Sequence, residues 1–176
     1  MKAIIIVLCI LLNFQSSHAA QICNDYITDE WPDSRYKTET LSGGNVVTDY
    51  KTRLMWKQCS EGLSGFACMT GTISTHNWQE ALNIPHDVNS NSGFAGFNDW
   101  RLPNIKELRS ISAINCVSPS INESVFPNTQ NNYYWSSSPF VGSHQDALSF
   151  SYVSGSDESN DRNSNHAVRL VRSVEQ

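Results

Sequence analysis

The strongest structural signal in the chain is the segment Asp99-Trp-Arg-Leu-Pro-Asn-Ile-Lys-Glu-Leu108. Asn104 and Glu107 have the spacing of a capping box, in which each side chain accepts a hydrogen bond from the backbone N–H of the other residue. This box predicts a helix from residue 105 to about residue 113. We interpret Arg101 as a buried or half-buried strut of the fold, bonded to a carboxylate or to carbonyls, rather than as a ligand contact.

The rest of the chain has the patterns of one more helix and several short strands. A helix is expected to begin near Thr75, with Ser74 or Thr75 as its N-cap, and to end at Pro85. The strand patterns occupy residues 46–47, 54–56, 133–138, 147–153 and 166–172, and the first two form a hairpin around a turn at 49–52. Two helices and short strands separated by long loops predict a compact α+β domain with an antiparallel sheet.

The first residues have the order of a secretory signal peptide. Lys2 is followed by an apolar run at residues 3–12, a polar stretch, and the small residues Ala19 and Ala20. The apolar run has about ten residues, whereas a helix that spans a bilayer needs roughly 20. We expect cleavage and a periplasmic or secreted protein without membrane insertion; a retained N-terminal anchor is the alternative. The chain is then divided into a signal peptide at residues 1–19, an irregular segment tied by a disulfide at 20–44, and a folded domain at 45–176.

The cysteine count agrees with export to an oxidising compartment. Cys9 lies in the signal peptide, so four cysteines remain, and three pairings are open to them. We expect Cys59–Cys68, which closes a short Gly-containing loop, and Cys23–Cys116, which ties the N-terminus to the middle of the chain. The close C-x-x-C pairs that zinc sites and thioredoxin-like redox sites need are missing from the sequence.

The charge balance and the motifs exclude several classes of function. The formal net charge is −5, and it becomes −6 once Lys2 leaves with the signal peptide. Sequence-independent nucleic-acid binding needs Lys and Arg to neutralise phosphates, so we expect no nucleic-acid partner. The histidines have no metal-ligand spacing, and the sequence has no G-x-S-x-G elbow, phosphate-binding Gly loop or H-E-x-x-H motif. We therefore expect no enzymatic activity and no cofactor other than calcium; an unrecognised hydrolase is the remaining alternative.

Two segments are candidate ligand loops, because loops held by a rigid sheet commonly carry binding. The first, residues 154–165, offers oxygen ligands of the kind that calcium takes. These are Asp157, Glu158, Asp161, Asn163 and Asn165. Calcium could bind at Asp157 and Asp161, although the spacing fits no EF-hand loop, and a solvated hairpin loop is the alternative. The second, residues 139–146, contains His144 and would lie at a neighbouring hairpin end.

Two roles are open to the tryptophans: stacking on a sugar ring, or packing in the hydrophobic core. Aromatic residues within apolar patterns are more often buried, so Trp56, Trp78, Trp100 and Trp135 are expected in the core. Trp31 lies outside any regular pattern and is expected to be exposed.

Four segments together resemble a known family. They are residues 47–56, 99–108, 126–138 and 167–172, in this order along roughly residues 45–172. The sequence resembles a bacterial exported family typified by the C-terminal domain of the Legionella collagen-like adhesin. The resemblance implies an α+β fold related to the C-type-lectin-like fold and, in the typifying adhesin, a trimer that binds sulfated polysaccharide. A more distant likeness is to formylglycine-generating enzymes, whose late cysteine pair has no counterpart here after Cys116.

Two departures from the adhesin limit what carries over. The chain has no Gly-X-Y tract, and its negative net charge disfavours a sulfated ligand. A smaller departure is Thr52-Arg53, where many relatives have Thr-Gly. We expect an exported, non-enzymatic module that binds a carbohydrate or a surface protein, with its oligomeric state open. The alternative is a structural or assembly protein of the envelope that mediates protein contacts.

Overall fold

The computed structural model describes residues 21–174, so the predicted signal peptide lies outside the described residues. The strands within this range are β1 (Ile22–Cys23), β2 (Tyr36–Leu41), β3 (Gly44–Asp49), β4 (Leu54–Lys57), β5 (Leu63–Ser64), β6 (Thr70–Gly71), β7 (Thr75–His76), β8 (Cys116–Val117), β9 (Tyr133–Pro139), β10 (Asp146–Ser151), β11 (Ser156–Asp161), β12 (His166–Ala167) and β13 (Val171–Ser173). The helices are α1 (Trp78–Ser90) and α2 (Ile105–Ser110), with 3-10 turns at Asp33–Arg35 and Phe66–Cys68.

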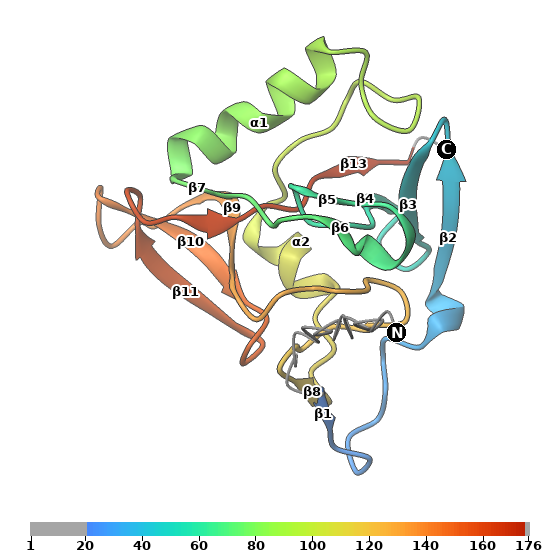
Figure 1. Cartoon of the computed structure of the whole chain (residues 1–176). Helices are drawn as coiled ribbons and strands as arrows, with labels where there is room; N and C mark the ends of the chain where they lie inside the picture. Colours follow the sequence, from blue (N-terminus) through green and yellow to red (C-terminus); the bar gives the residue numbers. More distant parts are fainter. Residues whose placement is uncertain (1–20, 175–176) are drawn as a thin grey trace, which may run out of the picture.

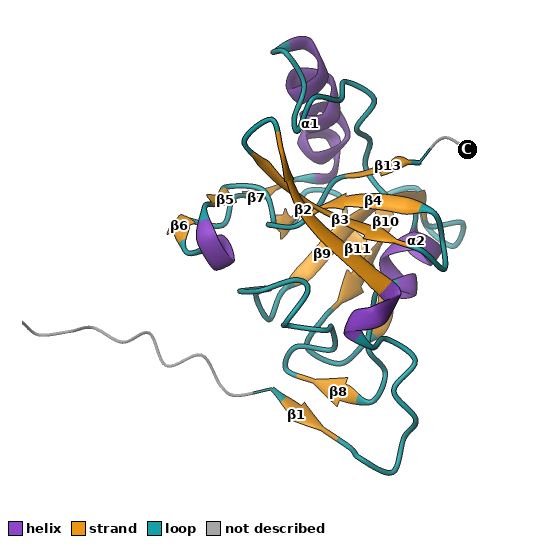
Figure 2. Ribbon diagram, turned by 90° about the vertical axis from the view of Figure 1, so that its right-hand side faces the viewer, coloured by secondary structure: helices purple, strands orange, loops and turns teal. Residues whose placement is uncertain are grey.

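Two sheets build the domain (Figure 1). The larger has the strand order β11-β10-β9-β12-β7, and the other has the order β13-β4-β3-β2. The ribbon β1–β8 lies at the end of the molecule opposite α1 in both views, and the ribbon β5–β6 lies beside the four-stranded sheet (Figure 2). The expected α+β class is confirmed. The pairing is not purely antiparallel, because β12 runs parallel to β9.

The four-stranded sheet contains the expected hairpin and one strand that the sequence did not predict. β3 and β4 pair in antiparallel register with Val47 opposite Trp56, which confirms the hairpin. β2 pairs with β3 along its whole length, so the expectation of an irregular segment through residue 44 is wrong. Trp31 is also buried rather than exposed, because it packs in the hydrophobic core, and its indole N–H donates to the carbonyl of Ser110 at 2.8 Å. The N-terminal segment is therefore part of the folded unit.

Helix α1 begins later and continues further than expected. Its N-cap is Asn77, whose side chain accepts from the backbone N–H of Glu80 while Glu80 caps the N–H of Asn77. Pro85 lies inside the helix and does not end it. Pro85 and Ala81 are buried on the side that packs on the core, and Val88 continues this side, so apolar packing outweighs the loss of one helix hydrogen bond.

Helix α2 confirms the capping box and the role of Arg101, but ends at Ser110 rather than near residue 113. Asn104 and Glu107 cap each other's backbone N–H groups at 3.0 and 2.8 Å. The guanidinium of Arg101 donates to both carboxylate oxygens of Glu107, at 2.8 and 2.7 Å. Burial would raise the pKa of Glu107, but the hydrogen bonds and charge of Arg101 outweigh it and lower that pKa. Asp99 is bound in turn by Arg172.

The C-terminal segment is two strands and not one. β12 pairs with β7 and β9 in the larger sheet, whereas β13 pairs with β4 in the other sheet. Arg169 lies between the two strands and is fully buried. The segment therefore connects the two sheets, which explains why every residue from 166 to 172 is buried.

Both expected disulfides are present, Cys23–Cys116 and Cys59–Cys68. The first joins the paired residues of the ribbon β1–β8. Trp56, Trp100 and Trp135 are buried in the core, as predicted. Trp78 is half-buried and packs against the cluster that contains Trp100 and Trp135. Within residues 21–174 no helix is long and apolar enough to cross a membrane.

Candidate functional site

The acidic segment that the sequence offered as a calcium loop is largely a strand. Ser156–Asp161 forms β11, which pairs with β10 over six residues. Asp157 is held in an ion pair by Arg109 of α2, and Glu158 lies on the opposite face of the strand. Asp157 and Asp161 are four residues apart along the strand, roughly 13 Å, so they cannot share one ion whose ligands lie at about 2.4 Å. The structure therefore does not bring Asp157 and Asp161 together at one calcium site.

The remaining residues of that prediction lie at the ends of the hairpins. Asn163 donates its backbone and side-chain N–H groups to Asp161, at 2.8 and 3.0 Å, and Asn165 and His144 are exposed. The two candidate loops lie next to each other, as expected, because the backbone N–H of Arg162 donates to the carbonyl of Gln145 at 2.9 Å. Among residues 21–174, no three His, Cys, Asp or Glu side chains are grouped to hold a metal ion.

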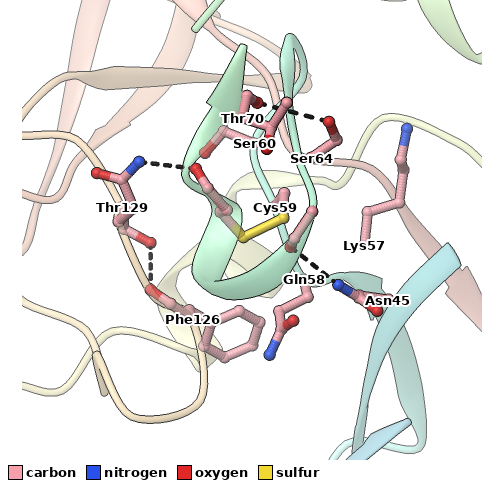
Figure 3. Close-up of a disulfide and its surroundings, with 12 residues drawn as sticks. Asn45, Lys57, Gln58, Cys59, Ser60, Ser64, Thr70, Phe126 and Thr129 are labelled. Carbon is pink, nitrogen blue, oxygen red and sulfur yellow. Dashed lines mark hydrogen bonds between the residues drawn. A yellow bond between two sulfur atoms is a disulfide. The ribbon is translucent and has the colours of Figure 1, made fainter. Parts of the chain in front are cut away.

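A groove beside the Cys59–Cys68 disulfide is a better candidate (Figure 3). We call residues 59–68 the disulfide loop. Two hollows of about 350 and 370 Å³ lie between this loop and the end of the β2–β3 hairpin. Thr40, Asn45 and Phe66 line both hollows, so the two form one surface, which we call the disulfide groove. The first hollow is also lined by Thr38, Glu39, Gln58, Ala67, Ser124 and Pro127, and the second by Gly43, Gly44, Lys57, Leu63, Ser64 and Phe94.

Phe66 stands between the two hollows and is 93% exposed. It begins the 3-10 turn that closes the disulfide loop, and the next two residues, Ala67 and Cys68, have the left-handed backbone angles φ 50° and 56°. Such angles are rare in residues other than glycine and persist where the surrounding structure determines them. The covalent link and this backbone therefore hold the ring in solvent, where it adds nothing to the hydrophobic core.

Side chains from two other parts of the chain fix the disulfide loop. Asn45 of β3 donates from Nδ2 to the carbonyl of Gly65 at 3.1 Å, as Figure 3 shows. Asn128 donates from Nδ2 to the carbonyl of Cys68 at 2.8 Å. The loop is thus anchored on both sides of Phe66, and the groove has walls that are already in place before a ligand arrives.

The base of the groove is held by Arg169. Its guanidinium donates to the backbone carbonyl of Gln58 and, at 3.2 and 2.8 Å, to the hydroxyls of Ser60 and Thr129. It also lies 5.0 Å from the ring centre of Phe126. No carboxylate among residues 21–174 forms a salt bridge with it, so backbone and hydroxyl oxygens and the aromatic rings of Phe126 and Tyr134 surround the charge. Arg169 therefore joins the start of the disulfide loop to the segment that carries Asn128.

The sequence comparison can now be added to this geometry. The family model described as the Lcl C-terminal domain matches residues 45–172. The chain belongs to the Lcl C-terminal domain family. A search of curated proteins finds no match to the chain. The family match begins inside the four-stranded sheet, so the folded unit extends N-terminally beyond it to β2 and Trp31.

A buried ion pair keeps the hairpin of the groove in place. Arg35 donates from Nε and Nη2 to the carboxylate of Asp49, at 2.9 and 2.6 Å, and the two side chains are 7% and 0% exposed. Burial alone would raise the pKa of Asp49. Hydrogen bonds from Arg35 and Thr52 and the guanidinium charge outweigh that effect and hold the pKa below its usual value. Asp49 is therefore ionised, and it ties β3 to the N-terminal segment.

The cysteine pattern by itself predicts only a structural role for the disulfide loop. One signal could have pointed to the site: Phe66 lies in a short polar loop closed by two cysteines, next to glycine and alanine. A ring in such a loop has no helical or strand pattern that would carry it to the core. The other lining residues come from distant parts of the chain, and the sequence gives no local sign that they meet.

Proposed function

We propose that the protein is an exported, non-enzymatic binding module whose ligand, a carbohydrate or another cell-surface ligand, occupies the disulfide groove. The observation that carries the proposal is Phe66, an aromatic ring 93% exposed between two hollows. Full burial of such a side chain contributes about 1.5–3 kcal/mol, and folding leaves this contribution unused. A ligand that covers the ring would gain it.

The rigidity of the groove supports binding over a purely structural role for the loop. The disulfide and the bonds from Asn45 and Asn128 order the loop in advance, so a ligand pays little for ordering it. Hydroxyl and amide side chains around the ring supply hydrogen bonds at fixed positions, which is how sites distinguish one polar ligand from another.

Export is part of the proposal. Two disulfides are typical of proteins in oxidising compartments, and the leader at residues 1–19 has the order of a signal peptide. We place the protein in the periplasm or outside the cell. The relation to the C-type-lectin-like fold, which the family resemblance implies, belongs to this proposal as well.

A glycan array and calorimetry on the oxidised protein test the function. We expect binding that Phe66→Ala weakens about tenfold or more, because the lost burial of roughly 1.4 kcal/mol equals a factor of ten. Phe140→Ala is the matched control: Phe140 is a partly exposed ring on the 139–146 loop, outside the groove. If Phe140→Ala abolishes binding and Phe66→Ala does not, the ligand binds at the hairpin ends and our site is wrong.

A second candidate function rests on a different surface. Apolar side chains are exposed at the β1–β8 end, including Ile22 at 67% and Ile114 at 57%, with Tyr26 and Val117 beside them in the sequence. Exposed apolar groups of this kind are typical of protein contacts, as an assembly protein of the envelope would need. Site-specific crosslinking in cells separates the two functions. Crosslinks to envelope proteins that Ile114→Asp removes and Phe66→Ala leaves intact would favour assembly.

A further inference from the structure

The charged side chains that line the disulfide groove are already compensated. Lys57 Nζ lies 2.7 Å from Glu61 Oε1, and the two side chains are 12% and 14% exposed. The same ammonium lies 4.3 Å from the ring centre of Phe94, so it is engaged on two sides. A cation held in this way has little remaining attraction for an anionic ligand, because its partner's charge cancels its field outside the pair.

The other charged side chain in the lining is Glu39 of β2. Its Oε1 lies 2.8 Å from Nζ of Lys37 on the same strand. Both charges of the groove lining therefore belong to ion pairs whose partners are also within the chain, and the groove is locally neutral. The whole chain has a net charge of −5, which adds no attraction for an anion.

The uncharged groups of the lining suit a ligand with many hydroxyls. The hydroxyl of Thr40 donates to Asn45 Oδ1 at 2.7 Å, that of Ser64 to the carbonyl of Thr70 at 3.5 Å, and that of Ser124 to Asn122 Oδ1 at 2.6 Å. These three oxygens, and that of Thr38, have lone pairs that can accept hydrogen bonds from the hydroxyls of a ligand. Gln58 uses its Nε2 to donate to the carbonyl of Val125 at 3.0 Å, which leaves the side-chain carbonyl oxygen as an acceptor. A purely apolar ligand would desolvate these groups without replacing their hydrogen bonds, at a cost of about 1–3 kcal/mol each.

We infer that the ligand of the disulfide groove is an uncharged oligosaccharide that extends over both hollows with one sugar ring stacked on Phe66, an inference that rests on the function proposed above. A pyranose ring has an apolar C–H face, which packs on an aromatic ring, and a hydroxyl edge, which bonds to Thr, Ser and Gln side chains. Because Phe66 lines both hollows, a chain stacked on it has a sugar unit in each. A sulfated or carboxylated glycan would need a free Lys or Arg, and the lining offers none.

The test uses the oxidised full-length mature protein on an array that holds neutral, sulfated and carboxylated glycans. We expect the hits to be neutral oligosaccharides. Their Kd should change less than about twofold between 50 and 500 mM NaCl, because no ion pair forms that salt could screen. The corresponding monosaccharide should bind about tenfold more weakly or worse, since it fills one hollow. Phe66→Ala should weaken the oligosaccharide about tenfold, and Met69→Ala, a change of an exposed residue just after the disulfide loop, should leave it unchanged.

Three results would overturn the inference, and they differ in what they leave standing. Hits confined to sulfated or carboxylated glycans, with affinity lost at high salt, would refute the neutral ligand and keep the binding function. Neutral hits that Phe66→Ala does not weaken would place the ligand outside the groove. No hits of any class would refute the carbohydrate function itself and with it this inference.

Discussion

Replacement of Arg169 by methionine should destabilise the protein although it removes an unpaired buried charge. Two effects compete. Taking a guanidinium out of water costs several kcal/mol, and Arg169 has no carboxylate partner among residues 21–174 to offset that cost. Against this, the change removes donors from the carbonyl of Gln58 and from the hydroxyls of Ser60 and Thr129, and hydrogen bonds to a charged group contribute about 1.5–3 kcal/mol each.

The hydroxyls keep other partners, which limits the loss. Ser60 also bonds to the hydroxyl of Tyr134 at 2.8 Å, and Thr129 donates to the carbonyl of Phe126 at 2.8 Å. We therefore expect Arg169→Met to lower the free energy of unfolding by about 3 kcal/mol, mainly through the unpaired backbone carbonyl.

Urea denaturation of the oxidised protein measures this loss, with Lys106→Met on the exposed face of α2 as the control, expected within about 0.5 kcal/mol of the parent. Arg169→Lys should recover less than half of the loss, because one ammonium cannot bridge the loop base and Thr129 as the planar guanidinium does. An Arg169→Met protein as stable as the parent, or more so, would refute the reasoning and show that desolvation dominates.

Three further changes test the supports of the groove and the core. Replacing Cys59 and Cys68 together by alanine should cost about 3 kcal/mol, from the entropy of a loop with a sequence separation of 9, and lower Tm by about 6–12 °C; a loss under 1 kcal/mol would contradict it. Asp49→Ala should cost about 3–5 kcal/mol in chemical denaturation, because it leaves Arg35 buried without its partner, and an effect below 1 kcal/mol would contradict the buried pair. Burial lowers the pKa of His166, so the folded protein favours the neutral imidazole; the stabilisation is complete above the ordinary value of about 6.5 and is lost as the pH falls below it. Tm should therefore fall between pH 7 and pH 5 in the parent more than in His166→Gln, and equal slopes would refute this role.

The parts of the fold that sequence reasoning predicted have local signals. The capping box at Asn104 and Glu107 needs residues three apart, and the hairpin around Trp56 needs two short runs with a turn between them. The disulfides followed from the count and spacing of the cysteines. In each case the decisive contacts are close in sequence or are limited to few alternatives, so the pattern is enough.

The wrong predictions concern helices and strands whose secondary structure depends on contacts with distant parts of the chain. Ser156–Asp161 is polar on both faces and has no strand pattern; it is a strand because β10 supplies its hydrogen bonds and Arg109 supplies a partner for Asp157. β2 is likewise an edge strand with polar side chains, fixed by β3. Pro85 remains in a helix because the helix packs on the core on both sides of it.

The groove could not be predicted for the same reason. Its lining comes from the β2–β3 hairpin, the disulfide loop and the residues around Ser124, which are up to 89 positions apart when Thr38 is compared with Pro127. Only the fold brings them together. Phe66 alone carried a sequence signal, because an aromatic ring in a short polar loop between two cysteines has no pattern that would bury it.

The most direct test of the central claim, that the disulfide groove binds the ligand, is a map of backbone amide chemical shifts during titration with the best neutral oligosaccharide from the array. The account predicts that the shifts that change most belong to residues 38–45 and 57–67, the two walls on either side of Phe66. Changes concentrated instead at residues 139–146 and 161–165 would contradict it and place the ligand at the hairpin ends of the larger sheet.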